Sequence, residues 1–394
     1  MVHAEYPAAR TEFARMRVLN VNAMLDPVRG GGTAERTLQV SRYLAEAGVD
    51  TTILTTDVGL NNDRLKELGT VRVVALKCLN VRFYIPKVSF RQITNILAGQ
   101  DIIHLTSHWT ILNALVYYAA RMQHKPYVVC PAGALPIYGR SKFIKHIYNC
   151  VVGRRILRNA AGYIAITANE KSQFEAYGIS AERIAVIPNG VQTNNVVADD
   201  ASALRHRFEI GENPMILFMG RLHHIKGPDL LLEAFAGLKE RFPAAHLVFA
   251  GPDDGMLLLL KDMAHRFGLD KRVHFAGYLA GSEKHAAYRS ADLLAIPSRQ
   301  EAMSIVALEA GIVGTSVLLT NQCGFPEIAA IGGGECVDPT SSAIQQSLAT
   351  LLADRQKLKA MGARLQAYVR AHYTWDLTAS KYINLFRRIL GQQA

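Results

Sequence analysis

The 394-residue sequence has few cysteines, no long hydrophobic run and few acidic residues in one long stretch of its first half. Its five cysteines are odd in number and never form a CxxC pair, which argues against a disulfide framework and a thiolate metal site. No window reaches the roughly 18 apolar residues of a membrane span, and the first residues lack the apolar core of an export signal. These absences predict a soluble, cytoplasmic protein with reduced thiols.

The shortage of acidic residues is most pronounced between Leu68 and Asn169, where Asp101 is the only acid beside thirteen lysines and arginines. The whole chain carries a formal net charge of +11. A basic stretch of this kind favours an anionic partner. Apolar residues lie among its cations, including Phe143 and Ile147, so an anionic membrane surface is expected. A solvated basic face without a partner is the alternative.

Short β-branched segments alternate with amphipathic segments, which is the β-α-β pattern of a parallel sheet. The first series starts with a strand at 17–22, a helix at 33–48 and a strand at 50–56. After a polar stretch rich in Asn and Asp, a second series begins near Pro214, and the chain ends in one more amphipathic helix.

This pattern predicts an α/β protein with two doubly wound, Rossmann-like domains. We expect an N-terminal domain at 1–205, a C-terminal domain at 206–375 and a last helix in 376–394. Such sheets bind ligands at the carboxyl ends of their strands, so the active site is expected in a central cleft that both domains face.

A glycine-rich turn follows the first predicted strand. Gly30, Gly31 and Gly32 precede a helical pattern that Thr33 is expected to cap. Glycines allow a ligand to approach the backbone, and a helix start favours an anion. The spacing is not GxGxxG, so a nicotinamide or flavin cofactor is poorly supported. A simple flexible turn is the alternative.

In the second series, Arg221 and Lys226 lie in the turn after the first strand, before a helix expected from Pro228 to about Phe242. Two cations at the carboxyl end of a strand suit a diphosphate, because Arg offers a fork of donors and Lys a compact charge. Plain surface solvation is the alternative. The neighbouring histidines, at 223 and 224, are expected to be exposed.

Two carboxylates, Glu301 and Glu309, lie on either side of the start of a helix predicted at 305–312. Eight helical residues span roughly 12 Å, a length that suits one elongated ligand. The helix start offers free N–H groups for phosphate, and each carboxylate accepts hydroxyls. These N–H groups belong to Met303, Ser304 and Ile305. The order predicts a sugar, a diphosphate and a ribose; the alternative makes Glu301 a helix cap and Glu309 a solvent-facing residue.

Taken together, these motifs resemble those of the retaining glycosyltransferases of family 4, which have the two-domain GT-B fold. The resemblance covers nearly the whole chain. It rests on the glycine turn, "IPNGV" at 187–191, "GRLHHIKG" at 220–227, the E-x7-E pattern of the two glutamates, and "CGFPEI" at 323–328. It implies transfer of a hexose from a UDP- or GDP-linked donor with retained anomeric configuration, without a required metal or other cofactor. The last helix would return to the first domain.

The resemblance also implies roles for individual residues, with Glu301 on the donor sugar and Glu309 on the ribose. The donor site would comprise Gly31, Gly32, Arg221, Lys226, Glu301, Ser304, Ile305 and Glu309. The family's usual Gly-Phe-Gly-Leu after the first glutamate is "AMSI" here, at 302–305, so the sugar pocket is expected to differ.

A second departure concerns the first domain, where many members have a histidine and this chain has Ala132. His108 follows the preceding strand and is the candidate to act with Glu301 in catalysis. His104, inside that strand, is expected in the core.

The expected partners are the nucleotide sugar and a lipid-linked or polysaccharide acceptor, in cell-surface glycan biosynthesis on the inner face of the plasma membrane. A nucleotide-sugar epimerase on the same fold is one alternative. A non-catalytic binder of nucleic acid or another anionic polymer is a second alternative. A nucleic-acid binder would show steeply salt-dependent affinity, whereas a nucleotide diphosphate would stabilise a transferase.

Overall fold

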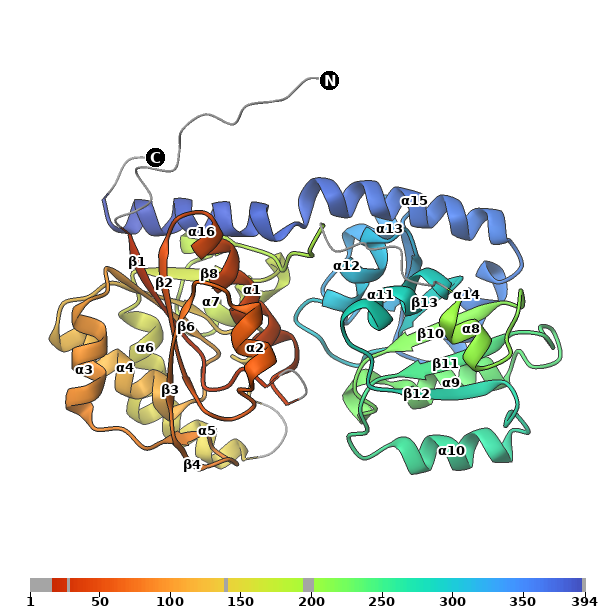
Figure 1. The fold of residues 1–394 in the computed structure, drawn as a ribbon, viewed down its shortest axis with the longest axis horizontal. Coiled ribbons are helices and arrows are strands. Elements are labelled where there is room, and N and C mark those ends of the chain that lie inside the picture. The colour runs from red at the N-terminus through yellow and green to blue at the C-terminus, as the bar shows by residue number, and fades with distance from the viewer. Residues whose placement is uncertain (1–15, 27–28, 138–140, 194–201, 392–394) are drawn as a thin grey trace, which may run out of the picture. The chain divides into compact units, whose positions relative to one another are not determined.

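The structure is a computed structural model that describes residues 16–26, 29–137, 141–193 and 202–391 (Figure 1). The chain forms two compact units. The first unit is Met1–Pro188 with Trp375–Ala394, and the second is Asn189–Thr374. Each is built on a parallel β-sheet with helices packed against it, which confirms the α/β class and the two Rossmann-like folds.

The first unit has a seven-stranded sheet of order β3-β2-β1-β6-β7-β8-β9, with every neighbouring pair parallel. Its central strands are continuous apolar runs because helices cover them, and Val18, Leu19 and Val21 are fully buried. The strands are β1 (Arg17–Val21), β2 (Asp50–Thr56), β3 (Arg72–Leu76), β6 (Ile102–Thr106), β7 (Tyr127–Cys130), β8 (Gly162–Ala165) and β9 (Ile184–Val186). A separate antiparallel pair joins β4 (Cys78–Asn80) and β5 (Ile85–Pro86).

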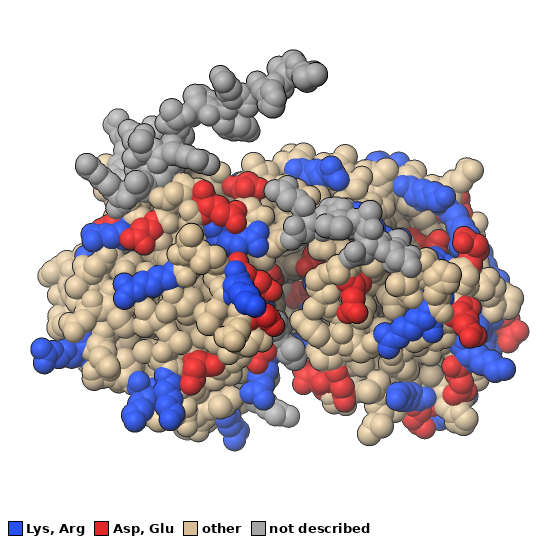
Figure 2. All heavy atoms as spheres, viewed as in Figure 1, with Lys and Arg blue, Asp and Glu red and all other residues tan. Residues whose placement is uncertain are grey.

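The helices of the first unit include one from the end of the chain. They are α1 (Gly31–Glu46), α2 (Asn62–Glu67), α3 (Phe90–Ala98), α4 (Ile111–Met122), α5 (Lys142–Tyr148), α6 (Arg154–Arg158), α7 (Lys171–Glu175) and α16 (Trp375–Ile389). Figure 2 shows several Lys and Arg side chains at the end of this unit where Figure 1 labels β4 and α5.

The last helix, α16, packs against α1, as expected. Arg36 of α1 is completely buried, and its guanidinium donates to Tyr382 Oη at 3.0 Å and to the Ile187 carbonyl at 2.7 Å. His104 lies against the Tyr382 ring and bonds Asn20, so it is a core residue, as predicted. Burial lowers the pKa of His104 to about 3, so the imidazole is neutral.

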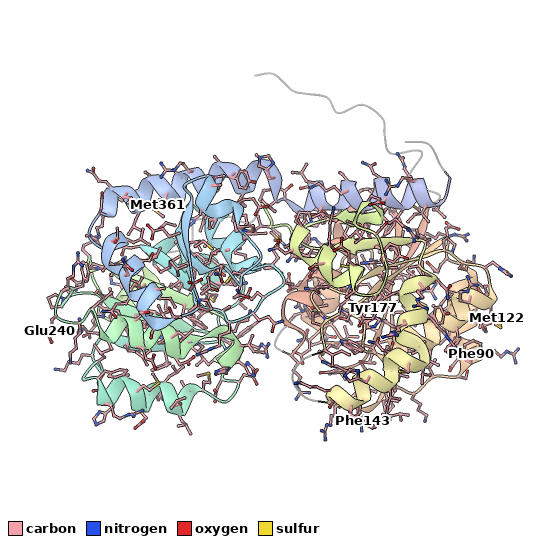
Figure 3. All side chains as sticks on the ribbon, turned by 180° about the vertical axis from the view of Figure 1, so that it is seen from behind. Phe90, Met122, Phe143, Tyr177, Glu240 and Met361 are labelled. Carbon is pink, nitrogen blue, oxygen red and sulfur yellow. The ribbon has the colours of Figure 1, made fainter. Side chains whose placement is uncertain are left out.

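The second unit has a six-stranded parallel sheet of order β12-β11-β10-β13-β14-β15. Its strands are β10 (Met215–Met219), β11 (His246–Ala250), β12 (Val273–Gly277), β13 (Leu293–Ile296), β14 (Ser316–Thr320) and β15 (Gly334–Val337). Its helices are α8 (Ala203–Arg207), α9 (Pro228–Ala236), α10 (Leu257–Arg266), α11 (Gly281–Ser290), α12 (Ile305–Ile312), α13 (Glu327–Ala330), α14 (Ser341–Leu351) and α15 (Arg355–His372). Met361 of α15 enters the core, whereas Glu240 beyond α9 stays at the surface (Figure 3).

Two local predictions differ from the structure. The first helix begins at Gly31 with Gly30 as its N-cap, so Thr33 lies inside the helix and does not cap it. Helix α9 ends at Ala236 instead of near Phe242, with Gly237 as its C-cap, and the Gly237 carbonyl accepts a hydrogen bond from Gln345 Nε2 of α14 at 3.2 Å. The helix predicted at 305–312 is confirmed as α12.

Candidate functional site

In the second unit, the loops that leave β10, β11, β13 and β14 meet at one edge of the sheet, because all these strands are parallel. The loop after β10 contains a 3-10 turn, His224–Lys226, followed by Gly227. Gly227 has φ +67°, and a Cβ there would lie 2.1 Å from the Pro297 carbonyl oxygen. Only glycine permits this approach, which brings Lys226 to the loop after β13.

Lys226 and Glu301 form an ion pair at this edge, with Lys226 Nζ 2.5 Å from Glu301 Oε1. Ser298 Oγ donates to the same carboxylate oxygen at 2.7 Å. Thr320 at the end of β14 donates its hydroxyl to the Ser298 carbonyl at 2.5 Å. The Glu301 side chain is only 8% exposed, and its second oxygen, Oε2, has no hydrogen-bond partner among the described residues. The carboxylate is thus held from one side and open to a ligand on the other.

The loop between β14 and α13 holds the loop of Glu301 in place. The Gln322 carbonyl accepts the Glu301 N–H at 2.8 Å, and the Cys323 carbonyl accepts the Ser304 N–H at 3.0 Å. Gly324 has φ +63°, and a Cβ there would lie 1.9 Å from the Ala302 carbonyl oxygen. The prediction that the Ser304 N–H is free is therefore wrong, because the Cys323 carbonyl accepts its hydrogen bond.

Two side chains of these loops are deeply buried. Ser304 is the N-cap position of α12, yet its Oγ makes no capping bond and has no partner among the described residues. Burial raises the pKa of the Cys323 thiol to about 12, so it supplies no thiolate nucleophile beside Glu301.

Glu309 lies on α12 and is held by two residues of α11. Lys284 Nζ lies 2.6 Å from Oε1, and Tyr288 Oη donates to Oε2 at 2.7 Å. Its side chain is 16% exposed. Glu309 is therefore not a free carboxylate that faces solvent, because each of its two oxygens already has a donor.

Arg221 is half exposed, and its guanidinium pairs with Asp254 at 2.5 Å. Asp254 belongs to the loop after β11, which Asp253 fixes by accepting the N–H groups of Gly255, Met256 and Leu257, where the loop enters α10. These hydrogen bonds lower the pKa of Asp253. Among the neighbouring histidines, His223 accepts the Ile225 N–H and so caps the 3-10 turn.

In the first unit, the glycine turn leads directly into α1. Gly31 has φ +50° with open space where a Cβ would stand, whereas a Cβ on Gly30 would lie 2.7 Å from the Asp26 carbonyl oxygen. The backbone conformation, not crowding, therefore explains glycine at Gly31. Gly32 lies in the first turn of α1.

His108 follows β6 and is only 2% exposed. Its ring lies against Trp109, Tyr148 and Tyr177, and its Nε2 is 3.2 Å from Asn149 Oδ1. Burial lowers the pKa of His108 to about 4. The imidazole is therefore neutral and packed, and contact with a substrate requires the surrounding aromatic rings to move.

The counterpart of the family's usual histidine, Ala132, lies in a tight turn after β7. It has φ +53°, and Gly133 follows with φ +79°. No imidazole is present at this turn, as the sequence predicts.

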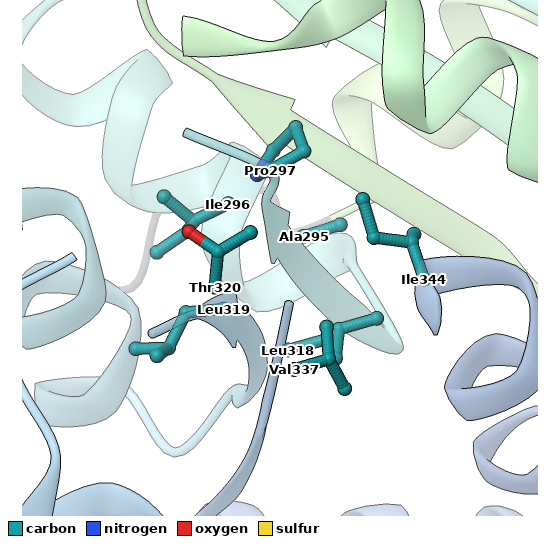
Figure 4. A pocket seen from close by; sticks show the side chains of 8 residues that line it. All are labelled: Ala295, Ile296, Pro297, Leu318, Leu319, Thr320, Val337 and Ile344. Atoms are coloured by element: carbon teal, nitrogen blue, oxygen red, sulfur yellow. The ribbon is translucent and has the colours of Figure 1, made fainter. Parts of the chain in front are cut away.

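A narrow gap between side chains lies beside Thr320 (Figure 4). It is lined by Ala295, Ile296, Pro297, Leu318, Leu319, Thr320, Val337 and Ile344. Thr320 contributes the only polar side chain of this lining, so the void is a packing gap in the core and not a nucleotide site.

Three residues that hold the glutamates were missed at the sequence level: Ser298, Lys284 and Tyr288. Lys284 and Tyr288 are four residues apart and so share one face of α11, but nothing in the sequence pairs that face with α12.

Among the residues placed in the structure, no group of three His, Cys, Asp or Glu side chains is arranged to hold a metal ion. No helix in the described ranges is long and apolar enough to span a bilayer.

Two family models match the chain. "Glycosyl transferase 4-like domain" covers residues 31–190, and "Glycosyl transferases group 1" covers residues 201–367.

Among curated proteins, a GDP-mannose-dependent alpha-(1-6)-phosphatidylinositol monomannoside mannosyltransferase of Mycobacterium tuberculosis is 32% identical over 237 residues, 56% of this chain and 60% of that protein. A D-inositol 3-phosphate glycosyltransferase of Nocardia farcinica is 32% identical over 254 residues, 61% of this chain and 55% of that protein. The chain thus matches over somewhat more than half the length of these relatives.

Among solved structures, Anabaena HepE in complex with UDP and glucose superposes with a TM-score of 0.78 at 19% identity, covering 94% of this chain and 98% of that one. WaaG, a glycosyltransferase involved in lipopolysaccharide biosynthesis, gives a TM-score of 0.68 at 18% identity and covers 94% and 99%. These likenesses establish the fold.

Proposed function

The chain belongs to the GT-B glycosyltransferases of family 4, and we propose that it moves a hexose from a nucleotide diphosphate sugar to a glycan acceptor with retention of configuration. The observation that carries this proposal is the Lys226–Glu301 pair at the carboxyl ends of β10 and β13. It sets a cation for the diphosphate beside a carboxylate whose Oε2 is open to the donor sugar's hydroxyls.

Around this pair, Lys226 and Arg221 would bind the diphosphate, and the N-terminal end of α12, at Ser304 and Ile305, would favour its charge. Gly31 and Gly32 would let the phosphates approach the backbone of the first unit. Glu309 would accept the ribose hydroxyls. One of its oxygens would then lose its present donor, Lys284 or Tyr288, or share that donor with the ribose.

For the chemical step, we propose that these cations stabilise the negative charge that develops on the departing diphosphate. Cys323 is buried with a raised thiol pKa, so it is no candidate for a covalent intermediate. Retention then follows from attack on the face that the diphosphate leaves, with a phosphate oxygen accepting the acceptor's proton. Glu301 would hold the sugar, and His108 would contribute only after its aromatic neighbours move.

GDP-mannose is our first choice of donor, because the mycobacterial relative is named for it, and a UDP-hexose is the second. For the acceptor we propose a lipid-linked or polysaccharide glycan, reached at an anionic membrane surface on the cytoplasmic side. The stretch with thirteen basic residues and one acid supports the anionic surface.

A thermal-shift screen of GDP, UDP and their hexose conjugates tests the donor. A ligand at 100 times its dissociation constant adds about 2.7 kcal/mol of stability. We expect one nucleotide diphosphate and its sugar to raise Tm while the other base does not. No shift with any of them, together with tight and salt-sensitive binding to nucleic acid, would favour the anionic-polymer alternative. Acceptor-free conversion of the donor sugar would favour an epimerase.

A further inference from the structure

One continuous helical stretch of the first unit, residues 142–158, presents an outer face that no other part of the described chain covers. It consists of α5, a π-helical turn (Asn149–Gly153) and α6. Within α5 no residue is buried. The inner side of the stretch, at Val152, Ile156 and Leu157, packs into the core of the unit.

The inner side also fixes the stretch firmly. Asn149 contacts His108 through Oδ1 and donates from Nδ2 to Tyr177 Oη at 2.9 Å. Tyr148 Oη donates to the Thr110 carbonyl at 3.0 Å. A Cβ on Gly153 would lie 2.4 Å from Asn149 Oδ1, so the helical backbone is tightly packed there. The outer face is therefore exposed on a helical stretch whose inner side is firmly packed.

The outer face combines exposed apolar side chains with basic ones. Phe143 is 76% exposed, Val151 56%, Ile144 51% and Ile147 47%. Arg154 and Arg155 follow them and are exposed. Because Val152, Ile156 and Leu157 face the core, these exposed side chains lie on the outer side of the stretch. Figure 3 shows Phe143 at the periphery of the first unit.

The surrounding sequence has no negative charge to balance these arginines. No acid occurs between Asp101 and Glu170, and Glu170 is itself buried. Four large apolar side chains exposed together are unusual for a surface that stays in water. Apolar residues beside unbalanced cations are the combination that an anionic bilayer binds, since the apolar side chains enter the interface and the cations meet the headgroups.

We infer that residues 142–158 form the membrane-docking element of this enzyme, with Phe143, Ile144, Ile147 and Val151 inserted among the lipids and Arg154 and Arg155 against anionic headgroups. This inference rests on the proposed membrane association and assigns that association to one element.

Vesicle sedimentation tests the assignment with the full chain and with vesicles of phosphatidylcholine, with or without about one-third phosphatidylglycerol. We expect the parent protein to bind the anionic vesicles. The double variant Phe143→Glu/Ile147→Glu should bind them at least about tenfold more weakly, because it places two negative charges in the docking face. Both side chains are exposed, so Tm should stay at the parent value. The matched control is Leu258→Glu, on α10 of the second unit, where Leu258 is 82% exposed; it should bind like the parent.

A second measurement uses Cys150, an exposed thiol within the π-helical turn of the stretch. An environment-sensitive fluorophore on Cys150, with Cys78 and Cys336 replaced by Ser, should shift to the blue on anionic vesicles. Cys130 and Cys323 are buried and should not react.

The outcomes separate the two levels of the proposal. If the parent binds no vesicles, the proposed membrane association itself is wrong. If the parent binds while the double variant binds equally well and the probe stays in water, another surface docks and the inference about 142–158 is overturned. It is overturned as well if the double variant abolishes a lipid-free dimer seen by sedimentation velocity, because the face would then meet a second copy of the chain.

Discussion

The two glutamates of the second unit have similar partners but differ in how those partners are arranged. Glu301 receives both of its donors, Lys226 and Ser298, on a single oxygen. Glu309 receives Lys284 on one oxygen and Tyr288 on the other. Each carboxylate therefore has one lysine and one hydroxyl, yet only Glu301 keeps an oxygen without a partner among the described residues.

This difference indicates two ways of meeting a ligand. Glu301 can accept a sugar hydroxyl at Oε2 without losing an existing bond, so its geometry is preorganised. Glu309 must share or exchange a donor before it binds a ribose, so part of the gain is offset by the bond it gives up. Changes at Glu301 should thus appear mainly in turnover, and changes at Glu309 in nucleotide affinity. The predictions below test that division, beginning with the largest effect.

Glu301→Gln should lower kcat on the order of 100-fold, because displacing the anomeric carbon by about 1 Å costs that much in rate. Affinity for the free nucleotide diphosphate should stay near the parent value, since the proposed partner of Glu301 is the sugar. Steady-state kinetics and calorimetry on the same preparation check this. Equal losses in turnover and in diphosphate affinity would mean that Glu301 does not act on the sugar end.

Lys226→Ala should weaken nucleotide diphosphate binding by about 10- to 100-fold, since hydrogen bonds to charged groups contribute roughly 1.5 to 3 kcal/mol. Lys284→Ala is the matched control, because it removes the lysine of the other carboxylate. We expect a smaller loss for it, as Tyr288 still holds Glu309. Isothermal calorimetry ranks the two variants, and a larger loss for Lys284→Ala would reverse the assignment of the diphosphate end.

Glu309→Gln should lower affinity for the nucleotide diphosphate and for its sugar by a similar factor, about tenfold, if one charged hydrogen bond to the ribose is lost. The kcat at saturating donor should change little. A matching loss for both ligands is the essential result. A loss confined to the sugar conjugate would place Glu309 at the sugar end and remove the contrast with Glu301.

The sequence predicts the fold in detail because its signals are local. Alternating β-branched and amphipathic segments predict both sheets, and the apolar run after Met303 predicts α12 to the residue. The end of α9 was predicted near Phe242 and is wrong: the helix ends at Ala236, and the next carbonyl, that of Gly237, bonds Gln345 of another helix, a contact that no local pattern shows.

The candidate site shows the same limit. The positions of Lys226 and Glu301 after their strands follow from the parallel sheet, but their pairing depends on the approach of Gly227 to Pro297, which no local pattern encodes. The same holds for the Ser304 N–H, whose partner Cys323 comes from another loop.

The smallest predicted effect concerns Ser298, which shares the Glu301 oxygen with Lys226. Ser298→Ala removes one hydrogen bond from that oxygen, worth about 1 kcal/mol, so kcat should fall roughly fivefold while KM for the donor stays near its parent value. The control is Ser347→Ala: Ser347 is also buried and also donates to a carboxylate, that of Glu335, but on α14 and β15. Both variants should lose similar stability in thermal melts, because each loses one hydroxyl bond to a carboxylate. Only Ser298→Ala should slow transfer. If the two variants transfer sugar at equal rates, Lys226 alone orients Glu301, and the Ser298 hydroxyl does not help to position Oε2.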